Sequence, residues 1–404
     1  MEYTLGFFRM NPISSLYRWQ RLTPEDDHYF FGYYDRCPWD AENRLHLTLR
    51  VGQCERLPER GETADIGVVD RGGNYRKLVT TRAWCHQQGS MELFLPRHSG
   101  RFIYNDYDEG SDRIVTRIFE LGKGVVGTLP APVYAISADG RYAASLDFAR
   151  IPRRGYSYAD AVLSPDPWPR DLDGSGLRLV DLESGEVRMI ASYRQMIAEH
   201  PFGYELRGQR LWLNHAIFNC DGSRILWLFR QAPVDYDPRT LFWKTFMYTA
   251  KLDGSDTRCI LPEGYWDKQI SHQIWGRTPH EVLVDANWTG SGHHAIVFDD
   301  DRLPFVARKV ADSHGRMAHM VFSPDGSKLL ADSYPDQNGQ QTLGLIDCAT
   351  GAMEVIGVFD HRPEKPGIGE TRCDLHPRWS RDGKTVTVDS IHDGKHRAIY
   401  LLEL

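Results

Sequence analysis

A recurring hairpin motif constrains the fold of this chain more than any other feature of its sequence. The clearest copies are Phe322-Ser-Pro-Asp-Gly-Ser-Lys-Leu-Leu-Ala-Asp-Ser333 and Trp379-Ser-Arg-Asp-Gly-Lys-Thr-Val-Thr-Val-Asp-Ser390. In each copy a strand ends at the anchor residue, an Asp-Gly turn supplies positive φ, and a strand of alternating polarity follows. The copies are anchored at or near residues 39, 94, 136, 218, 275, 322 and 379.

The spacing of the anchors predicts the architecture. Successive gaps are 55, 42, 82, 57, 47 and 57 residues, about one four-stranded propeller blade each. Further strand pairs between the hairpins, at 177–189, 246–261 and 343–358, complete four strands per blade. We therefore predict an all-β fold, a seven-bladed β-propeller with WD40-like repeats.

The same spacing predicts the domain organisation. Residues 1–404 form a single domain, in which residues 1–27 lead in and close the ring. The long gap holds an inserted loop at 150–176, rich in Arg, Pro, Asp and Tyr, and a candidate short helix at 190–204. Two unrelated β-domains are the alternative, but no low-complexity linker divides the chain.

Composition excludes several classes of protein. The mean hydropathy is −0.48, and no run approaches the ~18 apolar residues of a membrane helix. The net charge of 48 − 55 = −7 argues against a nucleic-acid binder. Seven irregularly spaced cysteines and an N-terminus without a secretion signal predict a cytoplasmic protein. The oligomeric state is left open.

One position of the repeat carries candidate metal ligands. Three residues before an anchor, the chain faces the central channel, and four copies place histidine there: His215, His272, His319 and His376. Cys373 lies three residues before the last of them. Imidazoles and a thiol on one axis favour Zn²⁺, held by His272, Cys373, His376 and His319. His215 is either a ligand or a substrate contact. The alternative is that these histidines cap strands and hydrogen-bond between blades.

Two N-terminal segments are candidate ligand-binding loops, because each lies just before an inner strand. They are His28-Tyr-Phe-Phe-Gly-Tyr-Tyr-Asp35 and Trp84-Cys-His-Gln-Gln-Gly-Ser90. Amide and aromatic side chains around His86 are typical of sugar sites. The predicted substrate contacts are Tyr33, Tyr34, Asp35, Gln87 and Gln88. The alternative is that the aromatic residues only pack the blades.

The inserted loop carries a third candidate site. Residues 148–160 include Arg150, Arg153, Arg154, Tyr156 and Tyr158. Arginine suits carboxylate recognition because its guanidinium is a bidentate fork. Arg230, which ends a nearby predicted strand, is expected to add to this anion pocket. A solvated charged loop is the alternative.

Several of these runs together resemble a known group. They are Phe31-Gly-Tyr-Tyr-Asp with Pro38-Trp39, the Trp84–Ser90 segment, Tyr104-Asn-Asp, and Arg372-Cys-Asp-Leu-His-Pro-Arg-Trp. They are similar to the seven-bladed propeller polysaccharide lyases, which include ulvan lyases, rhamnosyl-glucuronate lyases and, more distantly, oligogalacturonate lyases. The resemblance extends from about residue 28 to 400.

The resemblance implies β-elimination at a uronic acid in an acidic oligosaccharide. His86 matches the family's first catalytic histidine, Arg150 would neutralise the carboxylate, and Tyr156 or Tyr158 would serve as the acid. The family's metal is structural, which would give the metal ligands a stabilising role. Where a second catalytic histidine is expected, this chain has Asn105 and Asp106, and we expect Asn105 to contact substrate.

Two other function classes remain open on the sequence. One is a propeller that binds a carbohydrate or a protein without catalysis. The other is a hydrolase or other glycan-processing enzyme that uses the channel metal. The sequence has no Gly-x-Ser-x-Gly elbow, P-loop or dinucleotide fingerprint after a strand.

Overall fold

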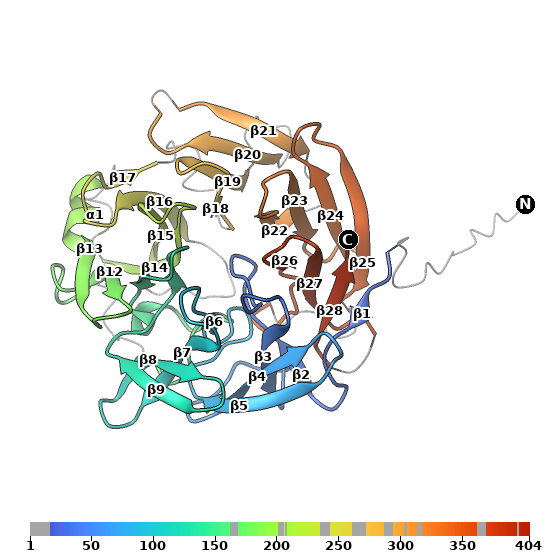
Figure 1. Cartoon of the computed structure of the whole chain (residues 1–404). Helices are drawn as coiled ribbons and strands as arrows, with labels where there is room; N and C mark the ends of the chain where they lie inside the picture. The colour runs from blue at the N-terminus through green and yellow to red at the C-terminus, as the bar shows by residue number, and fades with distance from the viewer. Residues whose placement is uncertain are drawn as a thin grey trace, which may run out of the picture.

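A computed structural model describes residues 17–161, 169–200, 206, 208–234, 243–260, 272–286, 294–302, 305–312, 317–361, 369–393 and 396–404. Their strands form seven four-stranded antiparallel sheets, which stand around a central axis like the blades of a propeller (Figure 1). This arrangement confirms the predicted all-β, seven-bladed fold.

The blades follow one another along the chain, each starting at the axis. The first contains β2 (His28–Phe30), β3 (Leu45–Val51), β4 (Ala64–Asp70) and β5 (Tyr75–Thr81). The second contains β6 (Leu93–Phe94), β7 (Arg101–Asp108), β8 (Arg113–Glu120) and β9 (Gly124–Leu129). The third contains β10 (Ala135–Ile136), β11 (Tyr142–Ser145), β12 (Gly176–Asp181) and β13 (Val187–Ser192), with η1 (Phe148–Arg150) inside the insertion and α1 (Tyr193–Glu199) after it.

The remaining blades have the same order. The fourth contains β14 (Gln209–Phe218), β15 (Arg224–Pro233), β16 (Lys244–Lys251) and β17 (Arg258–Cys259). The fifth contains β18 (Ile274–Trp275), β19 (Glu281–Ala286), β20 (His294–Asp299) and β21 (Ala307–Asp312). The sixth contains β22 (Met317–Phe322), β23 (Lys328–Ser333), β24 (Gln340–Asp347) and β25 (Met353–Asp360). The last contains β26 (Arg378–Trp379), β27 (Thr385–Ser390), β28 (Ala398–Glu403) and β1 (Gln20–Arg21).

The anchors of the sequence repeat hold neighbouring blades together. The indole Nε1 of Trp275 donates to the carbonyl of Ile217, 2.8 Å away, in the preceding blade. Trp379 makes the equivalent bond to Val321 at 3.2 Å. A buried donor needs a partner, so each indole both fills the space between two blades and fixes their spacing.

Both ends of the described chain meet in the last blade. β1 pairs with β28, with Gln20 opposite Leu401, and in Figure 1 the blue β1 lies beside the red β28. The backbone N–H of Leu22 extends this contact to Ile399 at 2.8 Å. The ring therefore closes through hydrogen bonds between its first and last strands. No helix among the described residues is long and apolar enough to cross a membrane.

The inner strand of the first blade leaves its ladder. Phe30 pairs with Leu49, and pairing resumes only where Trp39 meets His46. The residues between them run along the central channel. Gly32 begins this excursion with φ of +136°, and a Cβ there would lie 2.8 Å from the backbone carbon of Gln88.

We expect Gly32→Ala to lower the free energy of unfolding by about 1–3 kcal/mol. The alanine would hold an unfavourable positive φ, and its Cβ would clash with the backbone of Gln88. Gly52→Ala is the matched control, since a Cβ at Gly52 meets nothing within 4 Å. Urea unfolding of the two variants measures the difference. Equal stability of both would show that the excursion tolerates a side chain at Gly32.

Candidate functional site

Four imidazoles lie side by side at one end of the central channel. Ring centroids are 4.4 Å apart for His272 and His319, 4.3 Å for His319 and His376, and 6.2 Å for His215 and His272. His215, His272 and His376 have φ of +52°, +59° and +44°, a conformation uncommon outside glycine. The repeat position predicted to face the channel therefore does so.

Tyr33 and Tyr34 pack against this ring of histidines. The Tyr33 ring lies 5.0 Å from His376 and 5.1 Å from His215. Tyr34 lies 5.0 Å from His319, and its hydroxyl donates to the carbonyl of Gln273 at 3.3 Å. The excursion of the first blade thus brings two aromatic rings into contact with the channel histidines.

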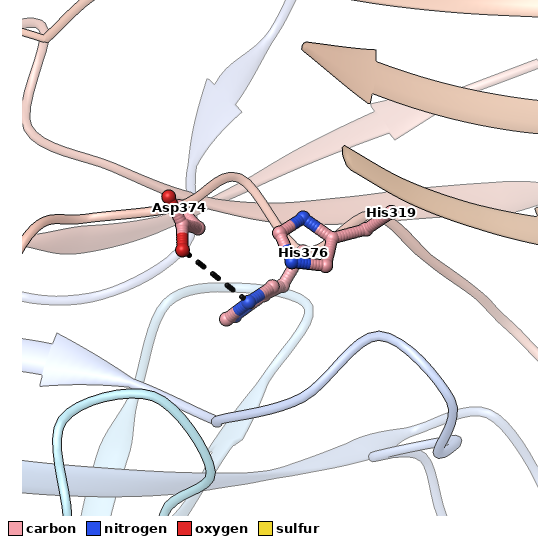
Figure 2. Close-up of side chains that lie close together, drawn as sticks. All are labelled: His319, Asp374 and His376. Carbon is pink, nitrogen blue, oxygen red and sulfur yellow. Dashed lines mark ion pairs between the residues drawn. The ribbon is translucent and has the colours of Figure 1, made fainter. Parts of the chain in front are cut away.

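Three of the channel residues form a candidate metal centre. His319, Asp374 and His376 each offer one ligand atom, and these atoms all lie within 4.8 Å of one another. In Figure 2 the Asp374 carboxylate and the two imidazoles converge. His376 Nε2 is 3.9 Å from Asp374 Oδ2. His319 comes from β22, and the other two precede β26.

The hydrogen bonds around these three residues fit a bound cation. His319 Nδ1 faces Asp332 Oδ2 at 3.0 Å, an outer carboxylate of the kind that orients a ligating histidine. Both ring nitrogens of His376 and the Oδ2 of Asp374 are buried without a hydrogen-bond partner. Buried polar atoms are rarely left unsatisfied, so a cation would complete the site.

The electrostatic setting keeps the imidazoles in the form that binds metals. Burial, and then the neighbouring His319, hold the pKa of His376 well below its ordinary value. Burial and His319 lower the pKa of His272 in the same way. Both rings are therefore neutral at pH 7, which leaves a nitrogen lone pair available.

The observed cluster differs from the predicted ligand set. His319 and His376 belong to it, and Asp374 takes the place that we expected Cys373 to hold. Burial raises the pKa of the Cys373 thiol to about 12, so the thiol stays protonated. Asp374 stands two residues before His376, in a segment that belongs to no strand and in which His376 has φ of +44°. Neither repeat position nor strand alternation therefore marked Asp374 in the sequence. His272 touches the His319 ring but lies outside the cluster of ligand atoms.

A second carboxylate group does not share these features. His280, Asp300 and Asp301 also lie within ligand distance of one another. Asp300 already accepts from Arg224 at 2.9 Å, and it faces His280 at 2.7 Å. Internal hydrogen bonds account for this group.

Beside the metal cluster lies a polar pair that the sequence did not single out. The hydroxyl of Tyr334 is 3.5 Å from Nε2 of His272. The guanidinium of Arg372 lies 5.0 Å from the Tyr334 ring centroid. It also donates to Asp374 Oδ1 at 2.8 Å. Neutral imidazole, phenol and guanidinium thus occupy one region.

Further arginines surround this region. Arg154 and Arg230 lie 4.9 and 5.3 Å from the ring centroid of Trp243. After burial and the neighbouring histidines, the charges of Arg372 and Arg230 also lower the pKa of His272. The charge of Arg230 therefore acts on His272, and its role in an anion pocket stays a prediction.

The inserted loop joins this region to the N-terminal segments. The N–H of Gln87 donates to the carbonyl of Gly155 at 3.0 Å. The N–H of Gly155 donates to Glu370 at 2.7 Å, and Arg154 pairs with the same carboxylate at 2.6 Å. When the Gln87 side-chain amide is turned so that its oxygen faces hydrogen-bond donors, that oxygen accepts from Arg372 at 3.2 Å. Part of the insertion, residues 162–168, lies outside the described residues.

The residues assigned to catalysis by resemblance have separate partners. His86 Nε2 contacts the carbonyl of Arg56 at 2.7 Å. Arg150 donates to the carbonyl of Leu211 at 3.1 Å. The buried Tyr156 hydroxyl has no hydrogen-bond partner. These contacts do not bring a base, an arginine and an acid to one point, so the assigned roles stay predictions.

Tyr158 and Asn105 also have structural partners. The amide of Asn105 donates to Tyr158 Oη at 3.1 Å and to the carbonyl of Val133 at 2.7 Å. Tyr158 stacks on Phe148 with centroids 4.5 Å apart. Gln88 similarly donates to Tyr134 at 2.9 Å. These bonds tie the second and third blades together and leave Asn105 no free amide hydrogen for a ligand.

His86 should make stability depend on pH. Burial lowers its pKa to about 4, whereas an unfolded chain has a histidine pKa of about 6.5. Between these values the unfolded state binds the extra proton, so stability falls as pH falls from about 6.5 to about 4. The loss for this group is about 3 kcal/mol. Denaturant unfolding from neutral to acid pH should show a shallower decline for His86→Gln. Parallel profiles would contradict a buried neutral His86.

Comparison with known proteins establishes the fold. No family model matches the chain, and no curated protein matches it in sequence. Among solved structures, an oligogalacturonate lyase in complex with manganese is similar with a TM-score of 0.66 and 18% identity, over 97% of this chain and 94% of that one. The oligogalacturonate lyase of Vibrio parahaemolyticus has a TM-score of 0.63 and 14% identity, over 96% of this chain and 94% of that one. This chain therefore has the fold of the oligogalacturonate lyase propellers.

Proposed function

We propose that this protein is a lyase that cleaves uronic-acid-containing oligosaccharides by β-elimination, at the histidine end of the channel. The observation that carries the proposal is the contact of His272 with Tyr334. This pair lies beside the candidate metal ligands His319, Asp374 and His376, of which Asp374 and His376 have ligand atoms without a hydrogen-bond partner. The shared fold with two oligogalacturonate lyases supports the same reaction class.

The His272–Tyr334 pair can move both protons of an elimination. Neutral His272 removes the proton from C5 of the uronate, the C4–O4 bond breaks, and Tyr334 donates its phenol proton to the departing O4. The product carries a C4=C5 double bond. The short path from His272 Nε2 to the Tyr334 hydroxyl, 3.5 Å, then returns the proton to the phenolate.

The C5 proton is only weakly acidic, so the adjacent carboxylate must be neutralised. Arg230 is the candidate, because its charge acts on His272. Charge placed where the anion develops lowers the barrier to proton removal. Arg372 is held by Asp374 and Tyr334, and we assign it the task of positioning these two side chains.

The metal centre would take His319, Asp374 and His376 as its protein ligands. A divalent cation bound there would supply fixed positive charge at the site. Imidazole suits several transition metals, and carboxylate oxygen also suits Mn²⁺. The prediction of Zn²⁺ combined the channel imidazoles with the Cys373 thiol. The observed cluster replaces the thiol with a carboxylate, so we propose Mn²⁺ for this donor set.

A screen of uronate oligosaccharides, followed by ultraviolet absorbance of the unsaturated product, tests the proposal. We expect absorbance to grow with substrates that carry uronate at the cleaved position and not with neutral oligosaccharides. Binding without product would instead support a non-catalytic carbohydrate-binding propeller. One observation favours this alternative: Asn105 stands where the resemblance expects the second catalytic histidine, and its amide is already hydrogen-bonded within the protein. Cleavage without a double bond would indicate a hydrolase.

A further inference from the structure

Apart from the histidine site, the structure has a pocket that we call the second pocket. It is a cavity of about 340 Å³. Its walls come from the ends of three inner strands, at Phe94, Ile136 and Phe218. The channel histidines lie three residues before such ends, and Tyr33 and Tyr34 pack against them. The next two residues, Asp35 and Arg36, line the second pocket.

The pocket has a buried charged floor with unmet hydrogen bonds. The side chains of Arg36 and Asp35 are 4% and 2% exposed. Arg36 Nε and Nη2 and Asp35 Oδ1 have no hydrogen-bond partner. The Nε–Oδ1 separation is 3.4 Å, without hydrogen-bond geometry. Arg36 Nη1 donates to the carbonyl of Gln88 at 3.4 Å. Because native proteins rarely leave such atoms unsatisfied, the floor points to a ligand.

The charge of the floor is balanced. Burial raises the pKa of the neighbouring Glu92 to about 8, so this carboxyl group is mostly protonated at pH 7. Burial also raises the pKa of Asp35, and the adjacent Arg36 opposes this shift. With Asp35 ionised beside Arg36, the pair contributes one charge of each sign. A ligand that carries both charges matches such a floor better than a simple anion or cation does.

The arrangement of these groups specifies the ligand further. Nε and Nη2 lie on one edge of a guanidinium, the fork that binds a carboxylate with two parallel hydrogen bonds. Asp35 Oδ1 accepts from a neighbouring ammonium group. Phe94, Ile136 and Phe218 offer an apolar wall. We propose that this pocket binds a free α-amino acid with an apolar side chain. The inference goes beyond the lyase proposal and does not depend on it.

An exposed cysteine allows the site to be probed directly. Cys220 lines the pocket and is the exposed member of the seven free cysteines. L-phenylalanine should slow its alkylation by iodoacetamide, measured by peptide mass spectrometry. Protection should reach about tenfold at about ten times the Kd found by calorimetry. Absence of binding at millimolar L-phenylalanine, or binding without protection of Cys220, overturns the proposal.

Ligand analogues and variants test the assigned contacts. L-phenylalaninamide lacks the carboxylate and N-acetyl-L-phenylalanine lacks the ammonium group, and each should bind at least about tenfold more weakly. Arg36→Gln and Asp35→Asn should weaken binding similarly. Ala138→Trp narrows the pocket from its exposed rim and should also abolish binding, which keeps the test valid if the buried variants fail to fold. Unchanged affinity of the amide or of a folded variant overturns the assignment.

Discussion

Replacement of His272 by alanine is expected to lower kcat for uronate cleavage by about 10²–10⁴-fold, the usual contribution of a general base. His272 contacts the Tyr334 hydroxyl and lies outside the metal cluster. His215 contacts the Tyr33 hydroxyl at 3.4 Å, but Arg372 lies against Tyr334, which places His272 beside the guanidinium. His98→Ala is the matched control because its side chain is exposed. Absorbance of the unsaturated product measures both rates, and circular dichroism verifies the fold.

The same histidine determines how the reaction should respond to pH. Burial and neighbouring positive groups hold the pKa of His272 well below its ordinary value. The base therefore stays neutral as pH falls, and the acid limb of kcat/KM should lie below the histidine value of about 6.5. Tyr334→Phe should lower kcat with a smaller effect on KM. Loss of activity in His86→Gln, with His272→Ala still active, would instead support the role that resemblance assigns to His86.

The fold was predictable because its signal is local and repeated. Each Asp-Gly turn fixes one hairpin, and the anchor before it ends an inner strand, as at Phe218 and Trp379. A four-stranded sheet buries its faces only against neighbouring sheets, so seven successive copies at about one blade each predict a closed ring. The insertion also followed from spacing, and α1 lies inside the segment that we expected to be a short helix.

The site was only partly predictable because it depends on contacts between blades. The position of His319 and His376 in the repeat predicted that both face the channel, but it could not predict the distance between their ligand atoms. Tyr334 follows β23 and meets His272 of the preceding blade, a contact across 62 residues that no spacing rule encodes. Asp374 lies outside the repeat position and outside the strands, two residues before His376. We predicted Cys373 as the ligand instead, because a thiol is a common zinc ligand.

Metal content of variants distinguishes the predicted ligand set, with Cys373, from the observed one, with Asp374. We expect His376→Ala and Asp374→Ala to lose the bound metal, measured by mass spectrometry of the purified protein. Cys373→Ser should retain it, because the protonated thiol lies outside the cluster. Retention by Asp374→Ala and loss by Cys373→Ser would restore the thiolate site and the case for Zn²⁺.

Stability provides an independent measurement of the same site. A ligand that binds only the folded state raises stability by about 2.7 kcal/mol at a hundred times its Kd. Chelation should therefore lower the Tm of the wild type and of Cys373→Ser, and leave the Tm of His376→Ala unchanged. Asp332→Asn removes the carboxylate charge that orients His319 and should weaken metal affinity about 10–100-fold. Asp332 is not itself a ligand in the cluster, but it contacts the His319 ring and accepts from the backbone N–H of His376 at 3.2 Å. Loss of affinity in Asp332→Asn would therefore show that this carboxylate positions the two histidine ligands.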